Sequence, residues 1–388
     1  MSEPAARSTE SRPAGLVVPL AALLAWGCGA APRPGTPPRD VVLLTIEGLR
    51  ADHCGMFGYP RETTFERRPE EGIRHDLDRV AQAGVLLAGA FAPSPRARES
   101  LSILLGAAGG GAPALASAFA AAGFETAAFC TGEEAAGLAA GFSASQVEAE
   151  DRATLGAAHL WVRERRQRPA GRPPFLLWVH LARPAPPLGD EVLADPYLDP
   201  ERVVSADHYD ADLRATNALV RSFVGVLEVL DPAAFGRTLL VVAGTQGAAL
   251  DPAEDELSDA LLHVPLVFRH PQSLTGSRVL EEVVELADVG PTLCEWLEIA
   301  LPPGLRGRSL LALFDSHVER ELEHRPALAV AGERWTVRSA RWRLFEPEGA
   351  LYDVERDPAM ESEVSAQHPD VVARLRAQAA GRGSGEDG

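Results

Sequence analysis

The residues most able to do chemistry stand where an apolar, β-favouring run stops. Residues 41–46 are apolar apart from one threonine, and the acidic residue Glu47 follows them directly. In an open α/β sheet, ligands bind beyond the carboxyl ends of the strands. A carboxylate at such an end is a usual oxygen ligand for a divalent metal. Glu47 is therefore a candidate for one half of a metal site. The alternative, of equal weight, is that it is a polar residue at the end of a strand with no metal to bind.

The elements that must position Glu47 follow a repeating pattern. Apolar runs of strand length alternate with segments of helical spacing, which predicts a mainly parallel sheet flanked by helices. Strands are expected at residues 40–46, 85–91, 126–130, 175–180, 238–244 and 264–268. Helices are expected at residues 76–84, 99–105, 114–122, 151–166, 208–230 and 288–297.

The pattern changes after about residue 320. Short strands at residues 335–338, 342–345 and 350–353 predict a small antiparallel sheet, followed by a terminal helix to about Ala379. We expect an α/β domain over residues 39–320, a smaller subdomain over residues 321–379 and a disordered tail over residues 380–388.

Composition limits the function classes. The chain has 388 residues and a formal net charge of -18, so it lacks the basic surface that nucleic-acid binding requires. No nucleic-acid partner is expected. All 37 basic residues are Arg, so no lysine can act as a nucleophile, base or phosphate ligand.

The N-terminus predicts export. Residues 1–28 resemble a signal peptide, with a weak basic start, an apolar segment too short to span a bilayer, and Gly27-Cys28 at a lipoprotein-like cleavage site. Residues 29–38 form a Pro-rich linker. The expectation is a lipoprotein anchored to membrane lipid through Cys28, on the periplasmic or cell-surface side. An ordinary secretory signal or a short anchor is the alternative.

The other cysteines are scattered and have apolar neighbours. Cys54, Cys130 and Cys294 form no CxxC pair, which argues against a zinc cluster. Buried thiols are the favoured interpretation. One disulfide is open to an exported protein, but the sequence does not pair these residues.

From about residue 39 to residue 376, the order of motifs resembles the sulfatases of the alkaline phosphatase superfamily. The segments that carry the resemblance are residues 40–53, 58–60, 90–94, 122–129, 175–180, 209–212, 264–266, 288–293, 304–310 and 351–358. The resemblance implies an alkaline-phosphatase-like fold. It also implies a calcium ion, a formylglycine nucleophile made from Cys or Ser, and basic groups and histidines that stabilise the transferred anion.

Mapped onto this chain, those functional positions hold other residues. Glu47 stands at the first metal Asp, and Thr245 stands at the second metal carboxylate. Gln246 could still offer a carbonyl oxygen. Ala97 stands at the nucleophile, and Ala185 stands at a loop histidine. An expected Asp is Asn217.

Two hypotheses from different classes follow from these losses. The first is a sulfatase-like protein of the cell envelope that is catalytically inactive, binds no cofactor (or Ca²⁺ if any metal is kept), and acts as a binding or scaffold module for an unknown ligand. The second is an atypical sulfuric-ester or phosphoric-ester hydrolase that uses Glu47 with a non-standard nucleophile. Fallback catalytic candidates are Ser94, Ser100 and His180, with Asp52 and His53 in rearranged roles. A phosphatase or phosphotransferase relative would need the same missing groups.

Overall fold

The computed structural model describes residues 36–66, 75–107, 110–168, 171–186, 188, 205–315 and 325–383. Residues 33–388 form one compact unit. The segment predicted to be a signal peptide, with Cys28, and most of the predicted linker lie outside the described residues.

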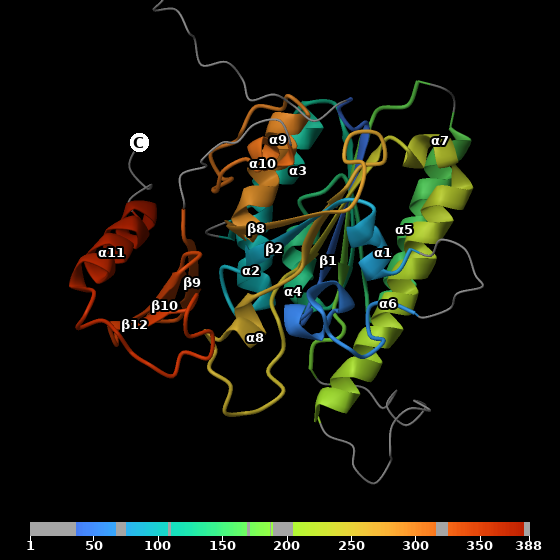
Figure 1. Cartoon of the computed structure of the whole chain (residues 1–388). Coiled ribbons are helices and arrows are strands. Elements are labelled where there is room, and N and C mark those ends of the chain that lie inside the picture. Colours follow the sequence, from blue (N-terminus) through green and yellow to red (C-terminus); the bar gives the residue numbers. More distant parts are fainter. Residues whose placement is uncertain are drawn as a thin grey trace, which may run out of the picture. The chain divides into compact units, whose positions relative to one another are not determined.

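Two sheets contain all the strands that the structure describes (Figure 1). Their bounds are β1 Asp40–Ile46, β2 Val85–Phe91, β3 Glu125–Thr131, β4 Ala144–Glu148, β5 Phe175–Leu181, β6 Thr238–Gly244, β7 Leu266–Arg269, β8 Arg278–Glu285, β9 Ala327–Ala331, β10 Arg334–Arg338, β11 Trp342–Glu346 and β12 Ala350–Asp353.

Helices cover both faces of the larger sheet. Their bounds are α1 Leu77–Gln82, α2 Ala97–Leu105, α3 Ala114–Ala121, α4 Glu133–Ala139, α5 Asp151–Gln167, α6 Ser205–Leu230, α7 Pro232–Phe235, α8 Asp259–Leu262, α9 Val289–Trp296, α10 Leu311–Phe314 and α11 Pro369–Gly383. Short 3-10 turns lie at η1 Ala51–His53, η2 Gly55–Phe57 and η5 Leu286–Asp288.

The larger sheet has the strand order β4-β3-β5-β1-β6-β7-β2-β8. All neighbouring pairs run parallel except those that β7 makes with β6 and β2, which are antiparallel. The prediction of a mainly parallel sheet is confirmed. β1 lies in the middle, so its carboxyl end is flanked by the ends of β5 and β6.

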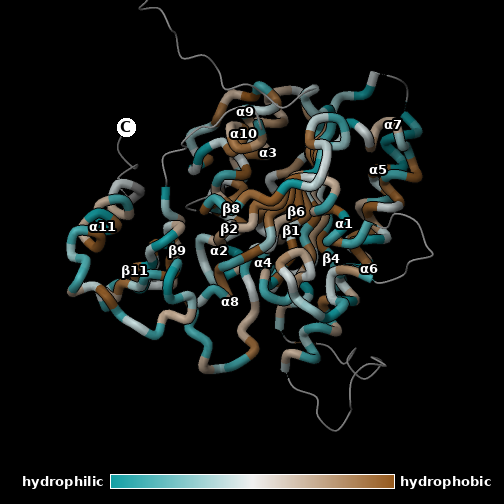
Figure 2. Tube along the Cα trace, viewed as in Figure 1, coloured by the Kyte–Doolittle hydropathy of each residue, from teal (hydrophilic) through white to brown (hydrophobic). Residues whose placement is uncertain are grey.

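Both faces of β1 are buried, which explains its continuous apolar sequence. Val41 and Leu43 belong to a core cluster with side chains of α2, α3, α4 and α9. Val42, Leu44 and Ile46 belong to a second core with side chains of α1, α5, α6 and α7. Figure 2 shows hydrophobic residues concentrated along the central strands.

The smaller sheet has the order β12-β11-β10-β9 and is antiparallel throughout, as predicted. Val337, Leu344 and Leu351 pack against Val371, Val372 and Leu375 of α11. Alanines of β9 join Phe91, Leu257 and Leu262 of the larger domain in another apolar cluster. The terminal helix continues to Gly383, a little beyond the expected end at Ala379.

The three described cysteines are free and buried, as favoured from sequence. Burial raises the pKa of each thiol, to about 11 for Cys294, so all three are poor nucleophiles at neutral pH. Within the described part of the chain, no helix combines the length and hydropathy that a bilayer span requires.

Candidate functional site

The end of β1 brings Glu47 between two neighbouring strands. The Glu47 backbone N–H donates to Leu181 O of β5 at 2.9 Å, and the Thr245 N–H donates to Ile46 O at 2.9 Å. Gly48 has φ +73°, and a Cβ there would lie 2.7 Å from the Cα of Ala185. This close approach seats Ala185 against the β1 loop. Glu47, Ala185 and Thr245 are therefore neighbours, as the mapped positions require.

The Glu47 carboxylate faces a buried histidine. Glu47 Oε2 lies 3.7 Å from Nε2 of His180, whose side chain is wholly buried while that of Glu47 is 20% exposed. Nδ1 of His180 lies 2.9 Å from the Thr45 hydroxyl, which also accepts from Trp178 Nε1 at 2.9 Å. The nearest polar groups to the His180 ring are thus the Thr45 hydroxyl, within hydrogen-bond distance of Nδ1, and the Glu47 carboxylate, which lies beyond hydrogen-bond distance of Nε2.

Thr245, which is mapped to the second metal position, is hydrogen-bonded to the next residue in the chain, Gln246. Thr245 is completely buried, and its hydroxyl donates to Oε1 of Gln246 at 2.5 Å. The Gln246 oxygen proposed as a ligand therefore already accepts a hydrogen bond. Calcium prefers six to eight oxygen ligands, including carboxylates. One carboxylate and one engaged amide do not fit that requirement, and the described residues contain no group of three or more His, Cys, Asp or Glu side chains able to hold a metal.

Ala97, which is mapped to the nucleophile position, lies further along the sheet than the ends of β1 and β6. Ala97 is the first residue of α2, which follows β2, and β2 is separated from β6 by β7. Its methyl side chain has no lone pair with which to attack an ester. The helix begins two residues earlier than the sequence predicted, so the Ala97 position is helical backbone.

Both fallback serines hold the start of α2. Ser94 is buried, donates its hydroxyl to Glu99 Oε2, and accepts from the Arg96 N–H at 3.2 Å. Ser100 is buried and donates to Ser94 O at 2.9 Å. These local bonds orient the loop before the helix and engage both hydroxyls.

Other acidic candidates have partners of their own. Asp52 forms two hydrogen bonds to Arg50, at 2.9 and 2.8 Å. Burial raises the pKa of the Asp52 carboxyl, but these bonds and the arginine charge outweigh it and lower the pKa overall. Asp76 caps α1 by accepting from the Arg79 N–H, and Asn217 accepts from the Leu77 N–H at 2.9 Å. The amide at Asn217 thus has a structural partner.

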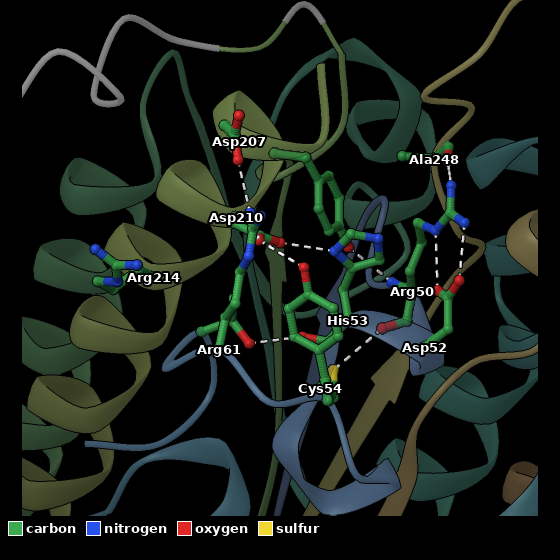
Figure 3. A network of polar contacts seen from close by, with 12 residues as sticks. Arg50, Asp52, His53, Cys54, Arg61, Asp207, Asp210, Arg214 and Ala248 are labelled. Carbon is green, nitrogen blue, oxygen red and sulfur yellow. Dashed lines mark hydrogen bonds and ion pairs between the residues drawn. The ribbon is translucent and has the colours of Figure 1, made fainter. Parts of the chain in front are cut away.

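A partly buried polar network joins the loop after β1 to α6 (Figure 3). Nδ1 of His53 lies 2.6 Å from Asp210 Oδ1, and the Tyr59 hydroxyl donates to Asp210 Oδ2 at 2.6 Å. Arg61 donates to the same carboxylate at 2.8 Å. The Tyr209 hydroxyl donates to Gly48 O at 2.8 Å.

This network fixes the backbone that presents Glu47. Sequence reasoning named His53 as a catalytic candidate and did not pair it with Asp210. The signal was available, because Tyr209 and Asp210 stand together in one of the quoted motifs. Burial and the Asp210 hydrogen bond raise the pKa of the Tyr59 hydroxyl, which therefore stays protonated at neutral pH.

Two curated proteins are similar in sequence to part of this chain. Arylsulfatase K of Mus musculus is 25% identical over 188 residues, and arylsulfatase K of Homo sapiens is 26% identical over 188 residues. Each alignment covers 43% of this chain and 34% of the relative, so the chain matches about a third of the length of these curated proteins.

Solved structures share the fold. A 2-O GAG sulfatase superimposes with a TM-score of 0.68 at 15% identity, covering 91% of this chain and 93% of that one. The phosphonate monoester hydrolase of Agrobacterium radiobacter gives a TM-score of 0.64 at 16% identity, covering 88% and 96%. The Sulfatase family model matches residues 39–299, which is more than half of the chain and includes every strand of the larger sheet. The chain therefore belongs to the sulfatase family.

Proposed function

We propose that this sulfatase-family protein does not hydrolyse esters and instead acts as a binding or scaffold module of the cell envelope. Ala97 carries the proposal, because a methyl group at the nucleophile position removes the covalent route to ester cleavage. The serines on either side of Ala97 are engaged in holding the start of α2.

The metal position supports the same function. The Glu47 carboxylate lies 3.7 Å from Nε2 of the buried His180, and the Thr245 hydroxyl donates to Gln246. A calcium ion would have to displace these contacts and would gain one carboxylate, whereas calcium affinity rises with the number of charged ligands. No catalytic step is therefore assigned to a metal.

The cell-envelope location rests on the sequence of residues 1–28. An exported lipoprotein would be attached to membrane lipid through Cys28. Expression of the full chain in a bacterium tests this part. The native protein is expected in the detergent-soluble membrane fraction and is expected to incorporate a lipid label. The Cys28→Ala variant is expected not to incorporate that label. Equal labelling of both proteins would overturn the anchor.

An assay of purified protein tests the lack of activity. Aryl sulfates, aryl phosphates and aryl phosphonates would be offered with Ca²⁺, Mg²⁺, Mn²⁺ or Zn²⁺, and metal content would be measured by elemental analysis. We expect no turnover above the rate of a Glu47→Ala variant. Turnover that Glu47→Ala abolishes, while the exposed control Glu164→Gln retains it, would overturn the proposal.

One contact favours a second candidate function, an atypical ester hydrolase. The Ser94 hydroxyl donates to the Glu99 carboxylate, which is the contact a serine nucleophile makes with a base. Ser94→Ala and Ser100→Ala distinguish the two functions. If any turnover is found, its loss in Ser94→Ala alone would assign the nucleophile to Ser94.

A further inference from the structure

A cavity opens at the carboxyl edge of the larger sheet, on the side of β1 where β5, β3 and β4 lie. It has a volume of about 610 Å³ and lies among the ends of β3, β4 and β5 and the helices α5 and α6. This volume is in the range of small-molecule sites, roughly 300–1,000 Å³. Alanines from several of these elements keep it open, namely Ala149, Ala182, Ala215 and Ala218. None of the residues mapped to the nucleophile or the metal lines it.

Three guanidinium groups from three different elements line this cavity. Arg183 follows β5, Arg152 begins α5, and Arg221 lies on α6. Arg183 donates to Asp212 at 2.6 Å, and Arg221 pairs with Glu66. Arg152 is exposed and has no hydrogen-bond or ion-pair partner among the described residues. The same lining holds three carboxylates, of Glu150, Asp151 and Asp212.

The carboxylates of the lining are mostly engaged. Asp151 is buried and accepts from the Ala182 and Arg183 N–H groups at 2.9 and 3.2 Å. Asp212 is buried and pairs with Arg183. Glu150 is exposed and does not cap α5 with its side chain. Among the described residues of the lining, the unpartnered guanidinium is therefore that of Arg152, and the amino end of the 17-residue helix α5 adds a favourable dipole.

We propose that this cavity binds a small molecule carrying an oxyanion group (a carboxylate, sulfate or phosphate) between the guanidinium groups of Arg152 and Arg183. The planar fork of an arginine matches such groups with two parallel hydrogen bonds. The inference rests on the proposed binding function and deepens it, because it places the ligand site apart from the residues mapped to the nucleophile and the metal.

Calorimetric titration of the purified full chain tests the site. The probes are inorganic sulfate, inorganic phosphate and glucuronate, at an ionic strength held constant with chloride, and they distinguish the three oxyanion sources. We expect saturable binding of at least one probe. Arg152→Gln should weaken it by about tenfold, since a charge-assisted hydrogen bond is lost. Arg163→Gln, an exposed change on the same helix away from the cavity, should leave it unchanged.

A second variant tests the cavity independently of charge. Ala215→Trp fills the lining from an exposed position on α6 and should abolish binding without unfolding the protein, as checked by circular dichroism. Absence of saturable binding for all three probes would overturn the inference. So would equal binding by the native protein and Arg152→Gln, or equal weakening by Arg163→Gln. Ester turnover would overturn the proposed function alone, because it is measured separately.

Discussion

At the ends of β1 and β6, the residues mapped to the metal positions lie beside other polar groups of the same strand ends. Glu47 faces His180 at 3.7 Å, and the Thr245 hydroxyl donates to Gln246. Buried polar groups are costly without partners, so the Thr245–Gln246 hydrogen bond stabilises this strand end. Under the proposed function, these positions together carry less negative charge than a calcium site needs.

Restoring that charge should restore a calcium response. In the triple variant Glu47→Asp, Thr245→Asp, Gln246→Asn, two carboxylates and an amide oxygen meet at the same strand ends. Because Thr245 is buried, we expect the calcium-free variant to unfold at a lower temperature than the native protein. Calcium at 100 times its dissociation constant should then stabilise the variant by about 2.7 kcal/mol.

Thermal unfolding with calcium and with chelator measures this effect. The native protein should show the same midpoint in both, and so should Thr245→Asn, which has no added carboxylate. A calcium-dependent rise in the native midpoint would contradict our interpretation of the strand ends.

Among the secondary-structure elements, the short strand β7 is followed by a buried histidine. His270 follows β7 directly, is completely buried, and packs edge-on against Trp296 of α9, with the ring centroids 5.8 Å apart. Burial, with a contribution from neighbouring Arg269, lowers the pKa of His270 from 6.5 to about 4. The folded protein therefore keeps this ring neutral where the unfolded chain would protonate it.

Stability should fall on acidification through this window. Between pH 6.5 and pH 4 the unfolded chain binds a proton at His270 that the folded protein does not, so the free energy of unfolding decreases as pH falls. The loss should approach about 3 kcal/mol near pH 4 and grow no further from this group below that pH. Above pH 6.5 this contribution to stability is fully present.

Urea unfolding across that range, on the native protein and His270→Leu, checks the prediction. The leucine variant should lose stability less steeply as pH falls, since it has no ring to protonate. If the free energy of unfolding changes with pH equally in the two proteins, other groups and not His270 cause the loss of stability in acid.

For the molecule as a whole, the small sheet is attached to the larger domain by a buried arginine. Arg343 of β11 is completely buried, pairs with Asp259 of α8, and donates to the backbone oxygen of Leu257. Phe91, at the end of β2, lies in the apolar cluster that the same surfaces form. The small sheet therefore also braces the strand that leads to Ala97.

Removing this arginine should loosen the attachment. We expect Arg343→Met to lower the free energy of unfolding by about 2–3 kcal/mol, because charge-assisted hydrogen bonds are lost from a buried site. Arg334→Gln in β10 breaks ion pairs that are partly exposed, and should cost at most about 1 kcal/mol. Urea unfolding compares the two. If the two variants lose the same small free energy of unfolding, Arg343 does not hold the two sheets together.

Several strands were not predictable from their own residues. β4 and β8 lie at the two edges of the larger sheet, where one side of the strand has no neighbour and polar residues are tolerated. Their sequences, ASQVE and RVLEEVVE, lack the continuous apolar run that marks β1 or β6. β9 is short and alternates in burial, and its register is set by β10.

The sequence by itself determined the apolar strands and the strand end at Glu47, because these are properties of local sequence, and the assignment of Ala97 and Thr245 to the nucleophile and metal positions stays a prediction. The tertiary structure alone decided that His180 faces Glu47, that His53 pairs with Asp210, and that β7 runs antiparallel. It also decided that Arg152 and Arg183 line one cavity. Each of these joins segments far apart in the chain, and their proximity follows from the strand order and register set by long-range packing.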